Sequence, residues 1–167
     1  MPLKENRDRL HNRVVRDIAR ERFAYPSEKY PSFKAYVNEP EPTMGVELKD
    51  GTIGYPDIVV VDTSGNVLKI VAEVETATTV SEREAEQEWR PYADVAPLYL
   101  YVPVGYAERA KKIYKQLKIP VVGLRTWRYV VGYEAIEVVD IETVPLSPLE
   151  RMLPGILLRP LQAMGLI

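Results

Sequence analysis

Two short segments, residues 58–61 and 67–74, carry apolar side chains at both odd and even positions. A strand that is apolar on both faces is typical of the interior of an α/β sheet covered on both sides. Ser64-Gly65-Asn66 lies between the segments, and these residue types favour a tight turn. The pattern therefore predicts a buried β-hairpin. One face of this hairpin would carry Val59, Val61 and Val71, and the other Ile58, Val60, Leu68, Ile70, Ala72 and Val74.

Apolar residues at helical spacing predict three amphipathic helices in the rest of the chain. The first spans residues 3–23, and its apolar stripe consists of Leu10, Val14, Ile18 and Phe23. The second follows Ser81, which with Glu84 matches a helix-capping box, and has Ala85, Trp89 and Tyr92 as its stripe. The third spans residues 106–118. Short strands are expected at residues 33–37, 44–49, 97–102 and within 121–139.

Composition restricts both the class of protein and the kind of site. A chain of 167 residues, of which 46% are hydrophobic, is long enough for one domain with its own core. Because it has no cysteine and only one histidine, disulfides, thiolate zinc sites and paired-histidine mechanisms are excluded. We expect this histidine, His11, at the surface rather than as a ligand.

Residues 1–25 are charged rather than apolar, and no run approaches the ~20 apolar residues of a membrane span. We therefore expect no signal peptide and no membrane-spanning segment. The expected location is the cytoplasm.

Acidic residues occupy the ends of both hairpin segments that lie farthest from the turn: Asp57 on the first, and Glu73 and Glu75 on the second. A three-residue loop with Gly65 or Asn66 in the left-handed conformation sets Asp57 opposite Glu73, with Glu75 on the same face. A two-residue loop would turn Asp57 and Glu73 to opposite faces unless a bulge compensates.

In the first register the Cβ atoms of Asp57 and Glu73 are roughly 5 Å apart. Like charges so close and partly buried repel each other, so the group needs protons, a basic partner or a cation. Carboxylate oxygens are the ligands that Mg²⁺ takes, usually with water completing its coordination. The cluster therefore predicts a divalent-metal site, with simple hydration of acids at the rim of the sheet as the alternative.

Pro56-Asp57, followed after fifteen residues by Glu73-Val74-Glu75, resembles the P-D…(D/E)-x-K signature of the PD-(D/E)XK nuclease superfamily. The predicted order of helix, acidic hairpin, helix and apolar strand also resembles the superfamily. The resemblance implies a restriction endonuclease-like, three-layer α/β/α core with a central mixed sheet, which we assign to residues 1–144. It further implies a Mg²⁺-dependent phosphodiester hydrolase that cuts DNA, with Mn²⁺ able to substitute and with Asp57, Glu73 and Glu75 as metal ligands and catalytic acids.

Glu75 departs from the superfamily, which usually has lysine at this position to orient or deprotonate the attacking water. Some restriction endonucleases resemble this chain in having glutamate there, and a carboxylate beside a metal-bound water can accept its proton. Lys49 is a candidate substitute for the lysine, and Gln87 or Arg83 for the polar residue that the following helix often supplies in the superfamily. The alternative is a catalytically impaired nuclease-fold module that binds DNA or a partner protein.

The net charge of −2 gives no overall attraction to nucleic acid, so DNA binding would depend on local basic patches. Arginines surround the stripe of the first helix, and others lie on the second. The candidate DNA contacts are Arg13, Arg16, Arg20, Arg83 and Arg90. Acidic residues alternate with the arginines of the first helix, so a hydrated helix face is the alternative there.

Residues 145–167 form a separate apolar segment interrupted by Pro148, Pro154 and Pro160. A large apolar surface is seldom left in contact with water. We therefore expect this C-terminal extension to pack on the domain or to cover a second subunit in a homodimer.

Overall fold

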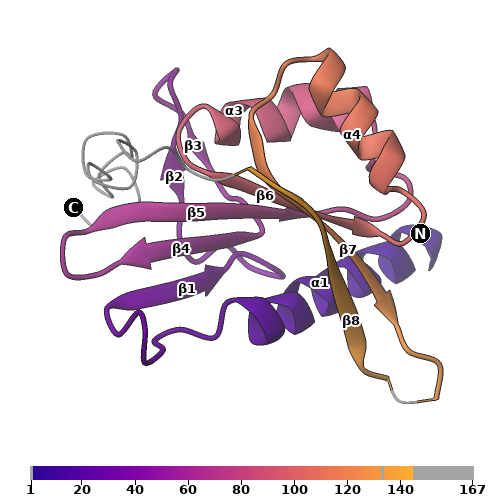
Figure 1. Ribbon diagram of the computed structural model, residues 1–167, viewed down its shortest axis with the longest axis horizontal. Helices are drawn as coiled ribbons and strands as arrows, with labels where there is room; N and C mark the ends of the chain where they lie inside the picture. Colours follow the sequence, from indigo (N-terminus) through magenta and orange to yellow (C-terminus); the bar gives the residue numbers. More distant parts are fainter. Residues whose placement is uncertain (1, 133, 145–167) are drawn as a thin grey trace.

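The computed structural model describes residues 2–132 and 134–144, which form a mixed α/β structure around a six-stranded sheet (Figure 1). The strand order is β1-β4-β5-β6-β7-β8, in which β5, β6 and β7 are parallel and the other neighbouring pairs are antiparallel. A second, two-stranded sheet pairs β2 with β3. The strands are β1 (Phe33–Val37), β2 (Val46–Glu47), β3 (Ile53–Gly54), β4 (Ile58–Asp62), β5 (Val67–Val74), β6 (Leu98–Pro103), β7 (Val121–Tyr129) and β8 (Ile136–Thr143).

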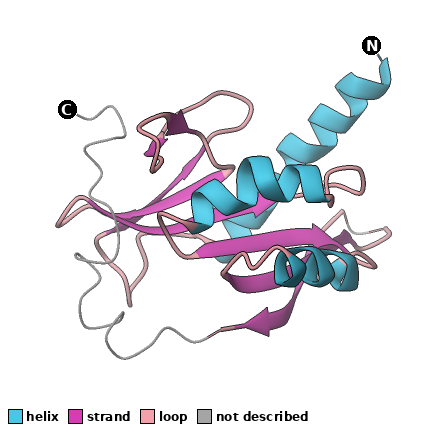
Figure 2. Cartoon of the chain, turned by 90° about the horizontal axis from the view of Figure 1, so that it is seen from above, coloured by secondary structure: helices cyan, strands magenta, loops and turns pink. Residues whose placement is uncertain are grey.

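Helices cover both faces of the six-stranded sheet (Figure 1, Figure 2). One face packs on α1 (Pro2–Arg22), through a cluster that includes Val14 and Ile18 of the helix and Ile58 and Val60 of β4. The other face packs on a helical segment and on α4 (Ala107–Gln116). The segment consists of α2 (Glu82–Glu84), the π-helix η1 (Ala85–Trp89) and α3 (Arg90–Ala93). The predicted mixed α/β class and the two-sided burial of the hairpin are confirmed.

The hairpin register sets Asp57 opposite Glu73 as predicted, but with a different turn. Ile58 pairs with Ala72, and continuing this register by one residue sets Asp57 opposite Glu73. At the other end Asp62 pairs with Val67, so residues 63–66 form the turn, and Asn66 is left-handed with φ 51°. The predicted three-residue loop is therefore wrong. A β-bulge between Val60 and Val61 compensates for the longer turn.

The bulge leaves Lys69 as the extra residue of β5, because Val60 pairs with Ile70 and Val61 pairs with Leu68. Leu68 is therefore buried in the cluster that contains Val61, rather than on the face of Ile70 as the simple alternation predicted. A single bulge changes the face of one side chain and preserves the alignment at the acidic end.

Other predicted elements differ from the structure mainly in their extent. Leu10 is 40% exposed, and Val15 joins Val14 and Ile18 in the buried stripe of α1. The strand expected at 44–49 is only the two residues of β2, and the region 121–139 contains β7 and the start of β8. The apolar extension at residues 145–167 lies outside the described residues. Within the described ranges, no helix has both the length and the apolarity needed to cross a bilayer.

Asn38, directly after β1, joins the segments that lead to the acidic end of the hairpin. Its side-chain Nδ2 donates to the carbonyl oxygens of Met44 at 2.8 Å and Pro56 at 2.6 Å. Its Oδ1 accepts from the backbone N–H groups of Thr43 and Met44, both at 2.7 Å. Its backbone N–H also donates to the Asp57 carbonyl oxygen at 3.0 Å. Asn38 thus joins two chain segments beside the acidic end of the hairpin, one at Thr43 and Met44 and the other at Pro56 and Asp57.

We predict that Asn38→Ala lowers the free energy of unfolding by about 2 to 4 kcal/mol, because it leaves several buried backbone groups without partners. Urea unfolding followed by circular dichroism measures the change. Asn66→Gly is the matched control, since glycine accepts the left-handed turn conformation and the change should stay within about 0.5 kcal/mol. Equal stability of the two variants would contradict the role assigned to Asn38.

Candidate metal centre

A cavity of about 380 Å³ opens at the acidic end of the β4–β5 hairpin. Residues from α1, from the connections around β1 and β4, and from the segment 73–88 line it. Its acidic lining residues are Asp8, Glu39, Asp57, Glu73, Glu75, Glu84 and Glu88, and its other lining residues are His11, Tyr55, Val74, Thr76, Thr78 and Thr79. The three acids predicted as metal ligands, Asp57, Glu73 and Glu75, all belong to this lining.

Backbone and side-chain hydrogen bonds fix Asp57 and Glu73 at the base of the cavity. Asp57 is 5% exposed, and its Oδ2 accepts from the backbone N–H of Val74 at 2.8 Å. The backbone N–H of Asp57 in turn donates to Glu73 Oε1 at 3.1 Å. Each acid is therefore held by a hydrogen bond across the hairpin. Asp57 accepts from the backbone of Val74 on β5, and Glu73 accepts from the backbone of Asp57 at the start of β4.

His11 reaches the same carboxylate from α1. Its Nε2 lies 3.2 Å from Asp57 Oδ2 and 3.0 Å from the carbonyl oxygen of Val74. Burial alone would lower the pKa of His11, but the hydrogen bond and charge of Asp57, with the charge of Glu39, raise this pKa to about 9. His11 is therefore protonated near neutral pH and donates to Asp57. The sequence had indicated a surface residue rather than a ligand, whereas His11 is partly buried, with a side chain 25% exposed, and lines the cavity beside Asp57.

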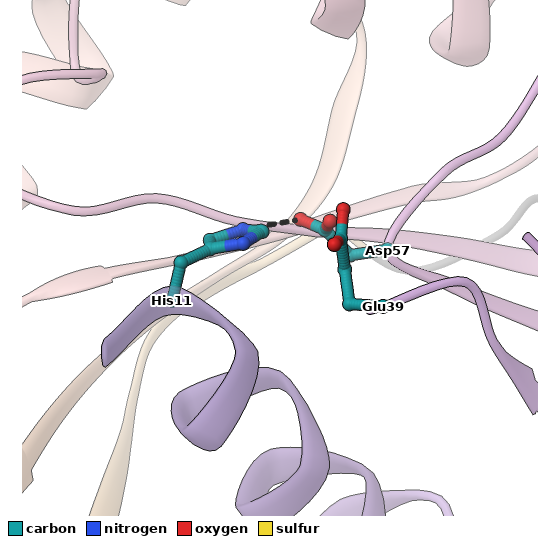
Figure 3. A group of neighbouring side chains, drawn as sticks. All are labelled: His11, Glu39 and Asp57. Atoms are coloured by element: carbon teal, nitrogen blue, oxygen red, sulfur yellow. Dashed lines mark hydrogen bonds and ion pairs between the residues drawn. The ribbon is translucent and has the colours of Figure 1, made fainter. Parts of the chain in front are cut away.

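Glu39 completes a group of three potential metal ligands with His11 and Asp57 (Figure 3). One ligand atom from each of the three residues lies within 4.8 Å of the others. Glu39 follows Asn38 after β1, and burial together with the charge of Asp57 raises the pKa of its carboxyl. Imidazole nitrogen and carboxylate oxygen suit several divalent metals, and binding one would require His11 to lose its proton.

Glu73 and Glu75 are almost completely buried, with 6% and 2% exposure. Burial and the charges of Asp57 and Glu75 raise the pKa of Glu73 well above its ordinary value. Burial, with the charges of Glu84 and Asp57, raises the pKa of Glu75 to about 8. Trp89 Nε1 donates to Glu75 Oε1 at 3.2 Å, which opposes this rise. A carboxyl group with such a pKa exchanges protons near neutral pH.

The helical segment presents two acids to the cavity and leaves the predicted polar residues away from it. Ser81 caps the segment by accepting from the N–H of Glu84, as predicted, and Ala85 and Trp89 are buried. Glu84 and Glu88 line the cavity, whereas Gln87 and Arg83 are exposed and do not. Lys49 also lies outside the lining, with its Nζ 4.0 Å from Asp94. The structure therefore brings none of the predicted supplementary residues, Gln87, Arg83 or Lys49, to the acids.

The arginines predicted to contact DNA do not line the cavity either. Arg13 and Arg20 both pair with Asp17, Arg90 pairs with Glu86 at 2.9 Å, and Arg16 is exposed. Arg13 also lies over the ring of Tyr129, with its guanidinium carbon 4.2 Å from the ring centroid. Within the described part of the chain, His11 is the only basic side chain of the cavity lining.

Two site residues, His11 and Glu39, were not predicted from the sequence. The signal for His11 was present, because positions 8, 11, 15 and 18 recur at helical spacing and lie along one side of α1. Glu39 had no such signal, since it lies between β1 and β2 in an irregular connection rich in proline. Its proximity to Asp57 depends on the pairing of β1 with β4.

Comparisons with known proteins found no matching family model, no similar curated protein and no similar solved structure. The functional proposal below therefore depends on the site itself and on the sequence resemblance stated above.

The raised pKa values predict that the metal-free protein becomes less stable as pH increases. Glu75 has an ordinary pKa of 4.5 when unfolded and about 8 when folded, so the folded state holds an extra proton between these values. Its contribution to stability is fully present below pH 4.5 and is lost as pH rises through 8, at up to ~1.4 kcal/mol per pH unit. His11, whose pKa rises from 6.5 to about 9, contributes in the same direction.

We therefore expect Glu75→Gln to raise the melting temperature in EDTA by roughly 5 °C at about pH 8, and by much less at about pH 5. Glutamine removes the buried charge and still accepts from Trp89. Thermal unfolding of the variant and of wild type at both pH values measures the difference. The exposed Glu82→Gln is the control, and a stabilisation by Glu75→Gln that does not depend on pH would contradict the assignment.

Proposed function

We propose that this protein is a divalent-metal-dependent phosphodiester hydrolase that acts on DNA. The observation that supports this proposal most directly is the convergence of acids from separate segments in one cavity. Asp57 precedes β4, Glu73 belongs to β5 and Glu39 follows β1, yet all three line the same space beside His11. Buried carboxyl groups in such numbers require protons or a cation, and the part of the cavity formed by described residues supplies only one basic side chain.

The donor atoms fit a divalent cation. Asp57 and Glu73 offer hard carboxylate oxygens on adjacent strands, and His11 and Glu39 offer further ligand atoms next to Asp57. We propose Mg²⁺ as the ion, with Mn²⁺ as a substitute that also suits imidazole. In this assignment Asp57 is the central ligand, because it contacts His11 directly and its backbone N–H holds Glu73 in position.

The residues around Asp57 divide the chemistry of hydrolysis between them. A bound divalent cation supplies positive charge that stabilises the phosphate in the transition state and acidifies a nearby water. With a cation held there, Glu75 would accept a proton from the attacking water, since its carboxyl lines the cavity and exchanges protons near neutral pH. Trp89 orients Glu75 by donating to its Oε1, and Trp127 Nε1 donates to its backbone oxygen at 3.0 Å.

The order of elements also supports the proposal of a restriction endonuclease-like fold. α1, the β4–β5 hairpin, the helical segment 82–93 and β6 follow one another along the chain, and β6 lies next to β5 in the sheet. This order resembles that of the PD-(D/E)XK superfamily, in which the acidic hairpin carries the metal ligands. We therefore assign the superfamily's fold and reaction together as one proposal.

A non-catalytic module is the second candidate, and one observation favours it. In the superfamily a lysine usually stands at the position of Glu75, and among the described residues no lysine or arginine lines the cavity. Such a protein would keep the nuclease fold and bind DNA or a partner protein without cutting. Metal binding and DNA cleavage, measured separately, distinguish the two candidates.

We expect Mn²⁺ or Mg²⁺ to raise the melting temperature of the wild-type protein. An ion at about 100 times its dissociation constant adds ~2.7 kcal/mol to the free energy of unfolding, because it binds the folded state alone. Asp57→Asn should remove most of this increment, since the amide keeps the side-chain volume but not the negative charge. Asp94→Asn, at an exposed acid outside the cavity, is the matched control. A metal response that is unchanged in Asp57→Asn would contradict the site.

We also expect the purified protein to cut DNA in the presence of Mg²⁺ or Mn²⁺ and to lose this activity in EDTA. Single-stranded, double-stranded and mixed substrates should be compared on denaturing gels. Asp57→Asn should cleave about 100-fold more slowly or worse, whereas Asp94→Asn should match wild type. Equal cleavage by wild type and Asp57→Asn would refute the hydrolase assignment. A metal-dependent rise in melting temperature without cleavage would favour the binding module.

A further inference from the structure

Tyr55 lines the cavity, but packing in the hydrophobic core does not account for the position of its ring. It lines the cavity, yet 49% of its surface is exposed. It belongs to neither of the two hydrophobic clusters that cover the sheet. Among the described residues, no aromatic ring or cation lies over it, whereas Tyr30, Phe33, Tyr36 and Tyr129 all have such partners. Tyr55 thus offers a large flat surface to whatever enters the cavity.

The local backbone holds this ring in place. Pro56 follows Tyr55 directly and restricts its backbone to extended conformations. The ring also lies close to Gly45, where an added Cβ would be 3.0 Å from Tyr55 Cε1 and 2.4 Å from Ile53 Cγ2. A side chain at position 45 would clash with Ile53 and crowd the ring, so the Tyr55 ring lies directly against Gly45. An exposed ring that is fixed in this way loses little conformational entropy when a ligand packs on it.

The charge of the cavity indicates what this ring can bind. Phosphate groups gain no attraction from the acidic lining, so within the described lining positive charge comes only from the bound metal, or from His11 while it keeps its proton. The remaining affinity for a nucleic acid has to come from an uncharged surface, and among the described lining residues Tyr55 offers the only large one. Stacking of a base on an aromatic ring contributes about 1 to 3 kcal/mol and does not depend on base identity.

We propose that Tyr55 stacks on the base next to the phosphate bound at the metal centre, and that the site therefore takes single-stranded DNA. A base can lie on the ring only when it is not already stacked and paired within a duplex. This inference rests on the proposed function, because it takes the acidic cavity as the place where the phosphate binds. It adds a substrate class and a specificity-determining residue to that proposal.

Binding in Ca²⁺ tests the inference without requiring cleavage. The probe is a short fluorescein-labelled DNA single strand, with fluorescence anisotropy as the readout. Tyr55→Ala should weaken binding at least about fivefold, whereas Tyr55→Phe, which keeps the ring, should stay within about twofold of wild type. Tyr30→Ala is the matched control, because Tyr30 is similarly exposed at 37% but lies before β1, outside the cavity lining. Melting curves establish that all the variants fold.

Two further probes identify the contact as stacking on an unpaired base. A strand in which abasic sites replace its nucleotides should bind wild type and Tyr55→Ala equally. A duplex of the same sequence should bind more weakly than the single strand. The inference is overturned if wild type and Tyr55→Ala bind the single strand equally. It is also overturned if the binding of wild type to the single strand is too weak to measure, or if the duplex binds more tightly than the single strand.

Cleavage assays in Mn²⁺ separate this inference from the proposed function. Tyr55-dependent binding without cleavage would refute the hydrolase and leave the ring as part of a binding module. Cleavage that requires Asp57 but has the same KM and kcat in Tyr55→Ala would refute the role of Tyr55 and leave the hydrolase assignment intact.

Discussion

Repulsion between buried carboxylates at the open end of the β4–β5 hairpin determines how the surrounding structure is arranged. Asp57 and Glu73 are fixed on adjacent strands, so they cannot separate without breaking the sheet. The backbone N–H groups of Val74 and Asp57, the indole of Trp89 and the imidazole of His11 all donate to these acids or to Glu75. Of these donors only the protonated His11 carries a charge, so the acids are stabilised only partly, and the raised pKa values of Glu73 and Glu75 reflect the remainder. A divalent cation would supply the further positive charge that these donors do not provide.

The sequence was sufficient to predict the centre of this arrangement. Apolar residues on both faces of residues 58–61 and 67–74 indicated a buried hairpin, and the positions of Asp57 and Glu73 relative to the turn indicated their pairing. The pairing is present although the predicted turn is not, because the bulge at Lys69 offsets the extra turn residue. Because both faces of the hairpin are apolar, the apolar pattern alone does not fix the register, and the prediction of this pairing depended on the turn or on a compensating bulge.

The parts that could not be predicted depend on contacts between distant segments or on which side of a helix meets the site. Glu39 reaches Asp57 through the pairing of β1 with β4, which leaves no local pattern in the chain. Gln87 was chosen from the side of the helical segment opposite its buried stripe, and that side is exposed. Glu84 and Glu88 line the cavity instead, and the sequence did not show which side of the segment meets the acids.

The bulge at Lys69 also makes the register at the acidic end of the hairpin independent of the length of its turn. On the turn side the pairs are Val61 with Leu68 and Asp62 with Val67, and on the other side the register is set by the buried pairs from Val60 to Ile58. A change in the length of the 63–66 turn can therefore be absorbed at the bulge before it reaches the acids. The tip of this hairpin, exposed at residues 63–66, is accordingly the natural attachment point for a spectroscopic label or an inserted peptide.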